Sequence, residues 1–131
     1  MSTAEKDANG EAQRTVTWAR RSEIVAFSPA PGITVQPVFG ESLMTCWIDI
    51  AAGAEVPQHA HLNEQCGVVV GGSVTITAAG ETRTLVVGDA YVVTPNLEHQ
   101  AVAGPEGVVL VETFVPIREE YRRLWEEASR R

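Results

Sequence analysis

The sequence predicts an all-β domain, a small closed antiparallel barrel or sandwich, with one α-helix at its C-terminal end. Its 131 residues fit a single domain. From residue 24 to residue 115 the chain is a succession of short runs rich in Val, Ile and Thr, each closed by Gly, Pro or Asn. Such closely spaced strands and turns are typical of antiparallel sandwiches and barrels. Only from Ile117 onward do apolar residues recur at helical spacing.

The expected elements follow one another without an interdomain linker. Residues 1–14 are small, polar and charged without periodicity, so we expect a disordered tail there. The barrel is expected over residues 15–116, with strands at 33–39, 43–50, 66–70, 73–78, 82–87, 90–93, 99–103 and 108–115. Segments between them, including 29–32, 71–72 and 104–107, hold the Gly and Pro residues that favour turns. Residues 117–131 form an amphipathic helix that should dock on the outside of the barrel or on a second subunit.

Charge is unevenly distributed along the chain and limits the classes of partner. The net charge is −7, and residues 24–117 hold nine acids against one base, Arg83. An acidic body opposes binding to nucleic acid, whose affinity comes from clustered Lys and Arg. No apolar run approaches the roughly 18 residues of a membrane-spanning helix, and the acidic N-terminal residues differ from a signal peptide. We therefore expect a cytoplasmic protein without a nucleic-acid or membrane partner.

The three histidines are the candidates for binding a metal, because Cys46 and Cys66 have no metal-binding spacing and are expected to be buried free thiols. On a strand, His59 and His61 would project to the same side, about 6 to 7 Å apart. Gln65 can offer an amide oxygen, and His99 returns on a later antiparallel strand. Neutral imidazoles with an amide oxygen suit a divalent transition metal, with two half-exposed strand histidines as the alternative.

The spacing of these residues resembles the two signature motifs of the cupin superfamily. The motifs are Gly53-x5-His59-x-His61-x3-Gln65-x6-Gly72, with Gln where Glu is commonest, and Gly88-x10-His99. The resemblance implies the cupin double-stranded β-helix, a jelly-roll barrel, with one divalent metal held by His59, His61, Gln65 and His99. A cupin that keeps this spacing but binds no metal remains the alternative.

The ligand set favours chemistry without a change of oxidation state. All four ligands are neutral, so the ion keeps its full charge and can polarise a carbonyl or hydroxyl group of a substrate. This favours isomerase, lyase or cyclase chemistry. The ion itself, Zn, Ni, Mn or Fe, is not determined by these ligands. An Fe(II)-dependent dioxygenase and a non-catalytic metal- or ligand-binding protein remain the alternatives.

Glu112 is the candidate for proton transfer. It shares one face of its strand with Leu110 and Phe114, among mostly apolar residues, where a carboxyl group has a perturbed pKa. Residues 112–121 resemble the tail of the pectin-degradation cupins, which carry Asp, Phe and Arg at the positions of Glu112, Phe114 and Arg118. The resemblance implies catalytic roles for Glu112 and Arg118; the alternatives are that Glu112 faces solvent or pairs with Arg118, and that Arg118 only starts the helix.

A small-molecule substrate is expected. The pectin-degradation cupins linearise unsaturated uronates, whereas the acidic barrel and its apolar lining suit a neutral or aromatic substrate such as a polyketide equally well. Candidate substrate contacts are Phe114, Arg118, Tyr91 and Trp47, with filling of the barrel as the alternative role of the aromatic residues. A homodimer is expected, because residues 15–27, with Trp18, could add an edge strand to the sheet of a neighbour.

Overall fold

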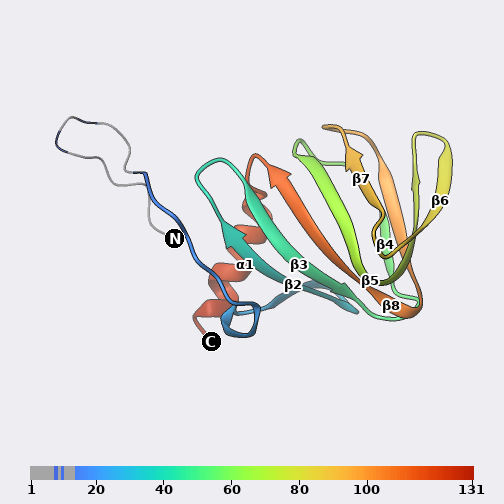
Figure 1. The fold of residues 1–131 in the computed structure, drawn as a ribbon, viewed down its shortest axis with the longest axis horizontal. Coiled ribbons are helices and arrows are strands. Elements are labelled where there is room, and N and C mark those ends of the chain that lie inside the picture. Colours follow the sequence, from blue (N-terminus) through green and yellow to red (C-terminus); the bar gives the residue numbers. More distant parts are fainter. Residues whose placement is uncertain (1–7, 9, 11–13) are drawn as a thin grey trace.

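Antiparallel strands account for most of the structure. The computed structural model describes residues 8, 10 and 14–131, so the tail predicted at residues 1–14 lies for the most part outside the described residues. The elements are η1 (Arg21–Glu23), β1 (Phe27–Ala30), β2 (Ile33–Phe39), β3 (Met44–Ile50), β4 (Glu55–His59), β5 (Glu64–Ala78), β6 (Glu81–Val86), β7 (Ala90–Val93), β8 (His99–Val115) and α1 (Glu119–Ser129) (Figure 1). The predicted all-β class with a C-terminal helix is confirmed.

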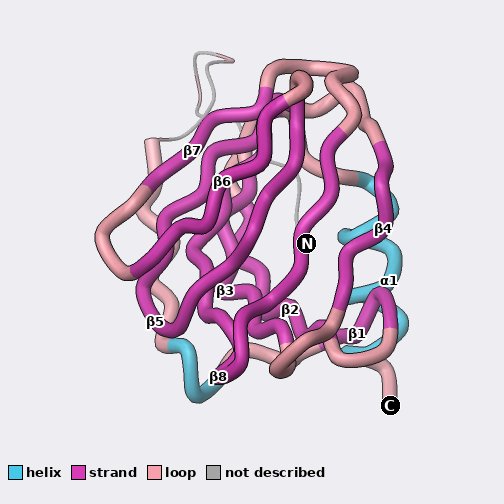
Figure 2. The backbone as a smooth tube through the Cα atoms, turned by 90° about the vertical axis from the view of Figure 1, so that its right-hand side faces the viewer, coloured by secondary structure: helices cyan, strands magenta, loops and turns pink. Residues whose placement is uncertain are grey.

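Two long strands, β5 and β8, connect two layers of sheet. All strands belong to one antiparallel sheet in the order β1-β2-β3-β8-β5-β6, with β4 paired to β8 and β7 paired to β5. The first half of β5 pairs with β7 and with the second half of β8, while the second half of β5 pairs with β6 and with the first half of β8. β3 extends the first layer and β4 the second. The two layers wind into a barrel (Figure 2).

The turns predicted at residues 71–72 and 104–107 are bends inside strands. The predicted strands 66–70 and 73–78 are therefore one strand, β5, and the predicted strands 99–103 and 108–115 are one strand, β8. The pairing of β5 with β8 shifts register around Gly71 and Gly72. Gly72 has a φ of +67°, and a Cβ at this position would overlap the carbonyl oxygen of Gly107 on β8. Glycine permits both the positive φ and the close approach of the two backbones. The glycines that indicated turns therefore let β5 and β8 pass from one layer into the other.

The core lies between the layers and is closed on one side by α1. Buried and partly exposed residues alternate along β2 and β3, as expected for strands with one face inside, and Met44 is completely buried. On α1, Tyr121 packs edge-on against Phe27 and Trp125 against Phe39, with ring centroids 5.2 and 5.4 Å apart. The helix thus docks on the barrel of its own chain. Among the described residues no helix is long and apolar enough to cross a membrane.

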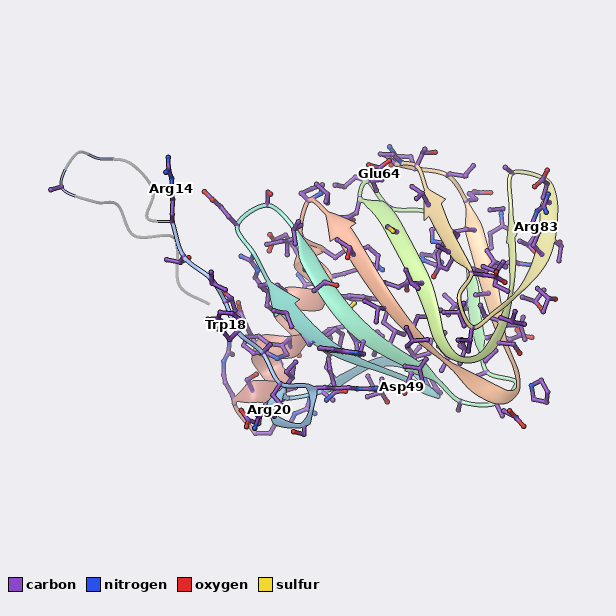
Figure 3. All side chains as sticks on the ribbon, in the orientation of Figure 1. Arg14, Trp18, Arg20, Asp49, Glu64 and Arg83 are labelled. Atoms are coloured by element: carbon purple, nitrogen blue, oxygen red, sulfur yellow. The ribbon has the colours of Figure 1, made fainter. Side chains whose placement is uncertain are left out.

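The segment before the barrel differs from its prediction. Residues 15–26 form no strand, while β1 includes two residues of the turn predicted at 29–32. Pro29 is tolerated in β1 because this strand lies at the end of the sheet order, where one side needs no ladder hydrogen bonds. Val16 and Trp18 are 67% and 87% exposed. Trp18 lies on the part of the chain that projects from the barrel (Figure 3).

The two cysteines lie in opposite environments, which corrects the prediction that both are buried. Cys46 is buried and Cys66 is exposed, because they point to opposite faces of the sheet. Burial, and next the charge of Glu112, raise the pKa of the Cys46 thiol well above its ordinary range. We expect a disulfide reagent to modify one thiol of the folded protein rapidly and two in denaturant. Rapid modification of two thiols in the folded protein would contradict this environment for Cys46.

Candidate metal centre

Three histidines converge at one end of the barrel. His59 ends β4 and lies opposite His99, the first residue of β8, while His61 lies in the loop that leads to β5. Their ring centroids are 4.3 Å (His59–His99), 5.1 Å (His61–His99) and 5.5 Å (His59–His61) apart. One ring nitrogen from each lies within 4.8 Å of the other two. The predicted cluster is present, although β4 ends before His61, so a shared strand face is not what brings His59 and His61 together.

The backbone fixes which nitrogen each ring offers. Nδ1 of His59, His61 and His99 lies 2.9, 3.0 and 2.8 Å from the carbonyl oxygens of Pro57, Asn63 and Leu97, respectively. A carbonyl oxygen can only accept, so Nδ1 of each ring carries the proton. Each neutral ring then has its lone pair on Nε2. This outer hydrogen bond is the usual arrangement around a metal-binding histidine.

Two features of the lone pairs fit a cation. Nε2 of His99 is buried and has no hydrogen-bond partner among the described residues. Nε2 of His61 lies 3.0 Å from Oε1 of Gln65. With the His61 proton on Nδ1, these two atoms are both hydrogen-bond acceptors and have no proton between them. Burial lowers the pKa of His61 and of His99, and for His61 the charge of Arg118 acts in the same direction, so both rings favour the neutral state. A divalent metal would satisfy these lone pairs.

Gln65, the fourth predicted ligand, lies beside the histidines. It is the second residue of β5, it is buried, and its side chain lies between His61 and Glu112. Its carbonyl oxygen is turned to the histidines, because its Nε2 donates a hydrogen bond to Oε2 of Glu112. Three imidazoles and one amide oxygen are donors that divalent Zn, Ni, Mn or Fe accepts. The described residues therefore fit the predicted divalent metal.

Glu112 is held beside this cluster by neutral partners. Glu112 is 5% exposed as a residue, and its Oε2 accepts hydrogen bonds from Gln65 Nε2 and, at 2.5 Å, from the Tyr91 hydroxyl. Burial raises the pKa of Glu112, while the two hydrogen bonds and the charge of Arg118 act in the opposite direction. Neither alternative for Glu112 holds, since it faces the interior and makes no ion pair with Arg118 in the described chain. A buried acid with a raised pKa suits proton transfer.

Arg118 lies at the cavity but is already paired. It is 8% exposed, forms an ion pair with Glu120, and its guanidinium lies 3.9 Å from the ring centroid of Tyr121 and 5.1 Å from that of Phe114. The two aromatic rings and the ion pair with Glu120 restrict the movement of the guanidinium. The positively charged guanidinium of Arg118 is thus held next to the histidines.

The four predicted substrate contacts do not all reach the same cavity. Phe114, Arg118 and Tyr91 line it, together with His59, Gln65, His99 and Glu112. Trp47 does not: side chains alternate along β3, and Trp47 points away from the face that carries Cys46 and Ile48. It lies instead near Arg21, whose guanidinium is 5.9 Å from the indole centroid. The predicted substrate contact of Trp47 is therefore corrected to a position on the outer face.

Sequence reasoning missed most of the cavity wall. The wall is largely aliphatic, and its apolar members other than Phe114 are Ile33, Ile48, Ile50, Val56, Ile76, Val93, Ala101, Leu110 and Tyr121. Alternation along each run identifies inward positions, but it does not show which inward side chains leave space between them. Asn63 was also missed: it is buried, and its amide donates to the carbonyl of Pro116, which ties the loop of His61 to the end of β8.

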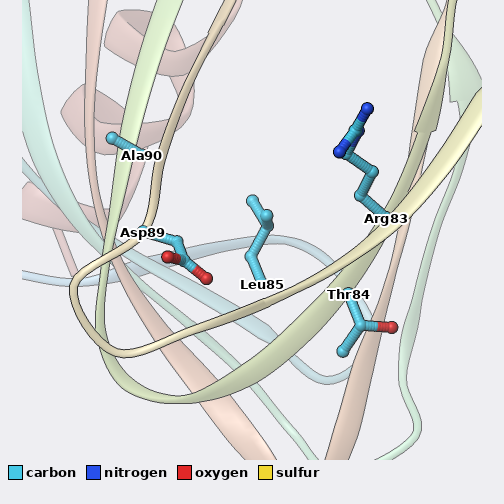
Figure 4. Close-up of a pocket in the computed structure, with 5 residues that line it drawn as sticks. All are labelled: Arg83, Thr84, Leu85, Asp89 and Ala90. Carbon is cyan, nitrogen blue, oxygen red and sulfur yellow. The ribbon is translucent and has the colours of Figure 1, made fainter.

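A second hollow, lined by none of the three histidines, lies on the surface. Its lining includes Arg83, Thr84 and Leu85 of β6, and Asp89 and Ala90 at the start of β7 (Figure 4). It contains none of the residues predicted to carry chemistry. The central cavity therefore remains the candidate site.

Comparisons with known proteins show which family the chain is similar to. The pectin degradation protein KdgF of Dickeya dadantii (strain 3937) is 36% identical over 84 residues, which cover 63% of this chain and 76% of that protein. The structure of KdgF from Halomonas sp. superposes with a TM-score of 0.76 at 29% identity, covering 82% of this chain and 99% of that one. H2HPP isomerase of Bacillus subtilis is 34% identical over 62 residues, 43% of this chain but only 26% of that protein.

The family model for the cupin domain matches residues 46–114, from β3 to the end of β8. This range contains the three histidines and Gln65, as well as Glu112. It covers more than half of the chain, and the similarity to KdgF extends over three quarters of that protein. The chain belongs to the cupin domain family.

Proposed function

We propose that the protein is a metal-dependent enzyme that catalyses an isomerase, lyase or cyclase reaction on a small oxygen-rich molecule. The observation that carries the proposal is the convergence of unprotonated His59, His61 and His99 nitrogens and the Gln65 oxygen beside the buried acid Glu112. The relatives named for pectin degradation and for an isomerase support chemistry of this class.

A bound cation and the residues of the cavity would have separate roles in this reaction. A bound divalent cation would polarise a carbonyl or hydroxyl oxygen and make neighbouring protons more acidic. Glu112 lines the same cavity and would accept or donate the proton. Arg118, fixed by Phe114 and Tyr121, would orient a negatively charged or strongly polar end of the substrate. The aliphatic wall would exclude water around the reacting atoms.

The cavity favours a compact substrate with few polar groups away from the metal. Apart from the residues already given roles, its wall offers mainly aliphatic side chains and the amide of Gln100. A polyhydroxylated sugar acid would need more hydrogen-bond partners than this wall offers. Its carboxylate would also compete with Glu120, which already forms an ion pair with Arg118. A cyclic or aromatic keto compound with neighbouring oxygens fits this lining better than an unsaturated uronate, the substrate class that the resemblance to the pectin-degradation cupins implies.

Turnover of metal-loaded protein in the absence of oxygen tests the proposal. We expect a panel of an unsaturated uronate, an aromatic 2-keto acid and a polyketide to include a compound that is converted anaerobically. Glu112→Gln should lower kcat by about 10²- to 10⁴-fold with the metal content unchanged, because it removes proton transfer but keeps an acceptor for Gln65. Conversion that requires oxygen would indicate a dioxygenase, and binding without conversion a non-catalytic protein; either result would contradict the proposal.

We further infer that two copies associate through the segment before the barrel. Val16 and Trp18 are strongly exposed, and β1 lies at the end of the sheet order. A second copy could cover this segment and pair with the free edge. We expect light scattering to give about twice the mass of one chain and Trp18→Ser to shift the equilibrium toward one chain. Arg83→Ser, on exposed β6, is the control, and a single-chain mass for the natural protein would contradict dimerisation.

A further inference from the structure

The orientation of the Gln65 side chain is decided by a residue outside the predicted ligand set. The two ends of a carboxamide are nearly equal in size, but only its oxygen can bind a cation and only its nitrogen can donate. Nε2 of Gln65 donates to Oε2 of Glu112, and Oε1 lies 3.0 Å from Nε2 of His61. The reversed amide would set its oxygen against the Glu112 carboxylate and turn its N–H groups toward the histidines.

Glu112 is itself fixed by Tyr91. The Tyr91 hydroxyl donates to Oε2 of Glu112 at 2.5 Å, so this oxygen accepts from both Tyr91 and Gln65. Within the described chain, the side-chain hydrogen bonds of Glu112 all fall on Oε2. The carboxylate is therefore held at one oxygen, with the group as a whole still at the cavity wall.

A missing side chain lets Tyr91 reach Glu112. Tyr91 is on β7 and Glu112 on β8, and β5 lies between these strands with Gly67 paired to both residues. A Cβ at Gly67 would overlap the ring and hydroxyl of Tyr91. The tyrosine thus crosses β5 in the space left open by Gly67. The strands β7, β5 and β8 keep their normal pairing at these positions, so the glycine alone makes room for the tyrosine ring.

We propose that Tyr91 and Glu112 are positioning residues for the metal, which keep the Gln65 oxygen turned toward the three histidines. Gln at position 65 and an acid at position 112 are then a matched pair: the amide donates to the acid and presents its oxygen to the ion. This inference rests on the metal site of the proposed function and is independent of any catalytic role of Glu112.

The affinity of the full-length chain for Zn²⁺, measured by competition with a chromophoric chelator, tests the proposal. Glu112→Leu removes the acceptor and should lower the affinity about 10- to 100-fold, the usual cost of losing an outer partner of a metal ligand. Glu112→Gln keeps an oxygen that accepts from Gln65 and should bind nearly as well as the natural chain. Tyr91→Phe should fall between them, and Arg83→Ser, on exposed β6 and outside this cavity, is the control.

A reciprocal exchange tests the matched pair directly. In Gln65→Glu two carboxylates face each other without a donor between them, whereas in the double variant Gln65→Glu with Glu112→Gln the new amide donates to the new acid. We expect the double variant to bind Zn²⁺ at least about tenfold more tightly than Gln65→Glu alone, a coupling that independent sites would not show.

The outcomes separate this inference from the proposed function. If the natural chain binds no divalent ion, the metal site itself fails and both proposals fall. If it binds Zn²⁺ but folded Glu112→Leu binds equally well, or if the effects at positions 65 and 112 are additive, only the positioning role is overturned. Should circular dichroism show that Glu112→Leu does not fold, Tyr91→Phe and the exchanged pair decide the question.

Discussion

His99→Ala should lower the affinity for Zn²⁺ by well over 100-fold. His99 supplies a buried Nε2 that has no other partner in the described chain, and its ring lies within 4.3 to 5.1 Å of the other two imidazole rings. Removing a ligand costs more than removing an outer partner, for which about 10- to 100-fold is typical. Competition with a chromophoric chelator measures the loss.

The same variant should separate metal binding from folding. Zn²⁺ at about 100 times its Kd should stabilise the natural chain by about 2.7 kcal/mol, which is visible as a higher Tm, and should not stabilise His99→Ala. Gln58→Ala, an exposed residue beside His59 that is bonded to Glu98, is the control and should keep the full increase. An equal rise of Tm in His99→Ala would show that the ion binds elsewhere.

Gly72→Ala should destabilise the fold by roughly 2 to 5 kcal/mol. The residue must keep a positive φ, and its new methyl group would overlap the Gly107 carbonyl, which belongs to the backbone of β8 and cannot rotate away. The left-handed conformation costs about 1 to 2 kcal/mol and steric overlap in a packed interior about 1 to 3 more. Urea unfolding of the two proteins measures the difference.

Gly80→Ala is the matched control for this prediction. Gly80 also has a positive φ, +76°, but a Cβ there would meet no atom within 4 Å. We expect it to cost only the conformational part, about 1 to 2 kcal/mol. If both variants lost the same stability, the close approach of β5 and β8 at Gly72 would contribute nothing.

The all-β class and the clustering of the candidate ligands were predictable because both depend on local patterns. Alternation located β2, β3, β6 and β7 to within a residue or two, and the motif spacing identified the three histidines and Gln65. The long strands were not predictable, because a glycine pair in a turn and a glycine pair in a bulge have the same local sequence. Only the partner strand distinguishes them: Gly72 lies against Gly107, which is 35 positions later in the chain.

The surroundings of the site were less predictable than its ligands. Glu112 was recognised as an acid on an apolar face, but its partners Gln65 and Tyr91 come from β5 and β7, so the register of three strands had to be known first. The prediction that Trp47 contacts the substrate was wrong for a related reason. A tryptophan on a half-buried strand has equal sequence reasons to point in or out, and the pairing of β3 between β2 and β8 decides.

The continuity of β5 and β8 through both layers has a consequence for how the barrel opens. Neither layer is complete without β5 and β8, because each of these two strands contributes one half of its length to each layer. Detaching one layer would leave the other without its central pair. Amide protons of both layers should therefore exchange with solvent in a single cooperative event, with no half-open state in which one sheet persists alone.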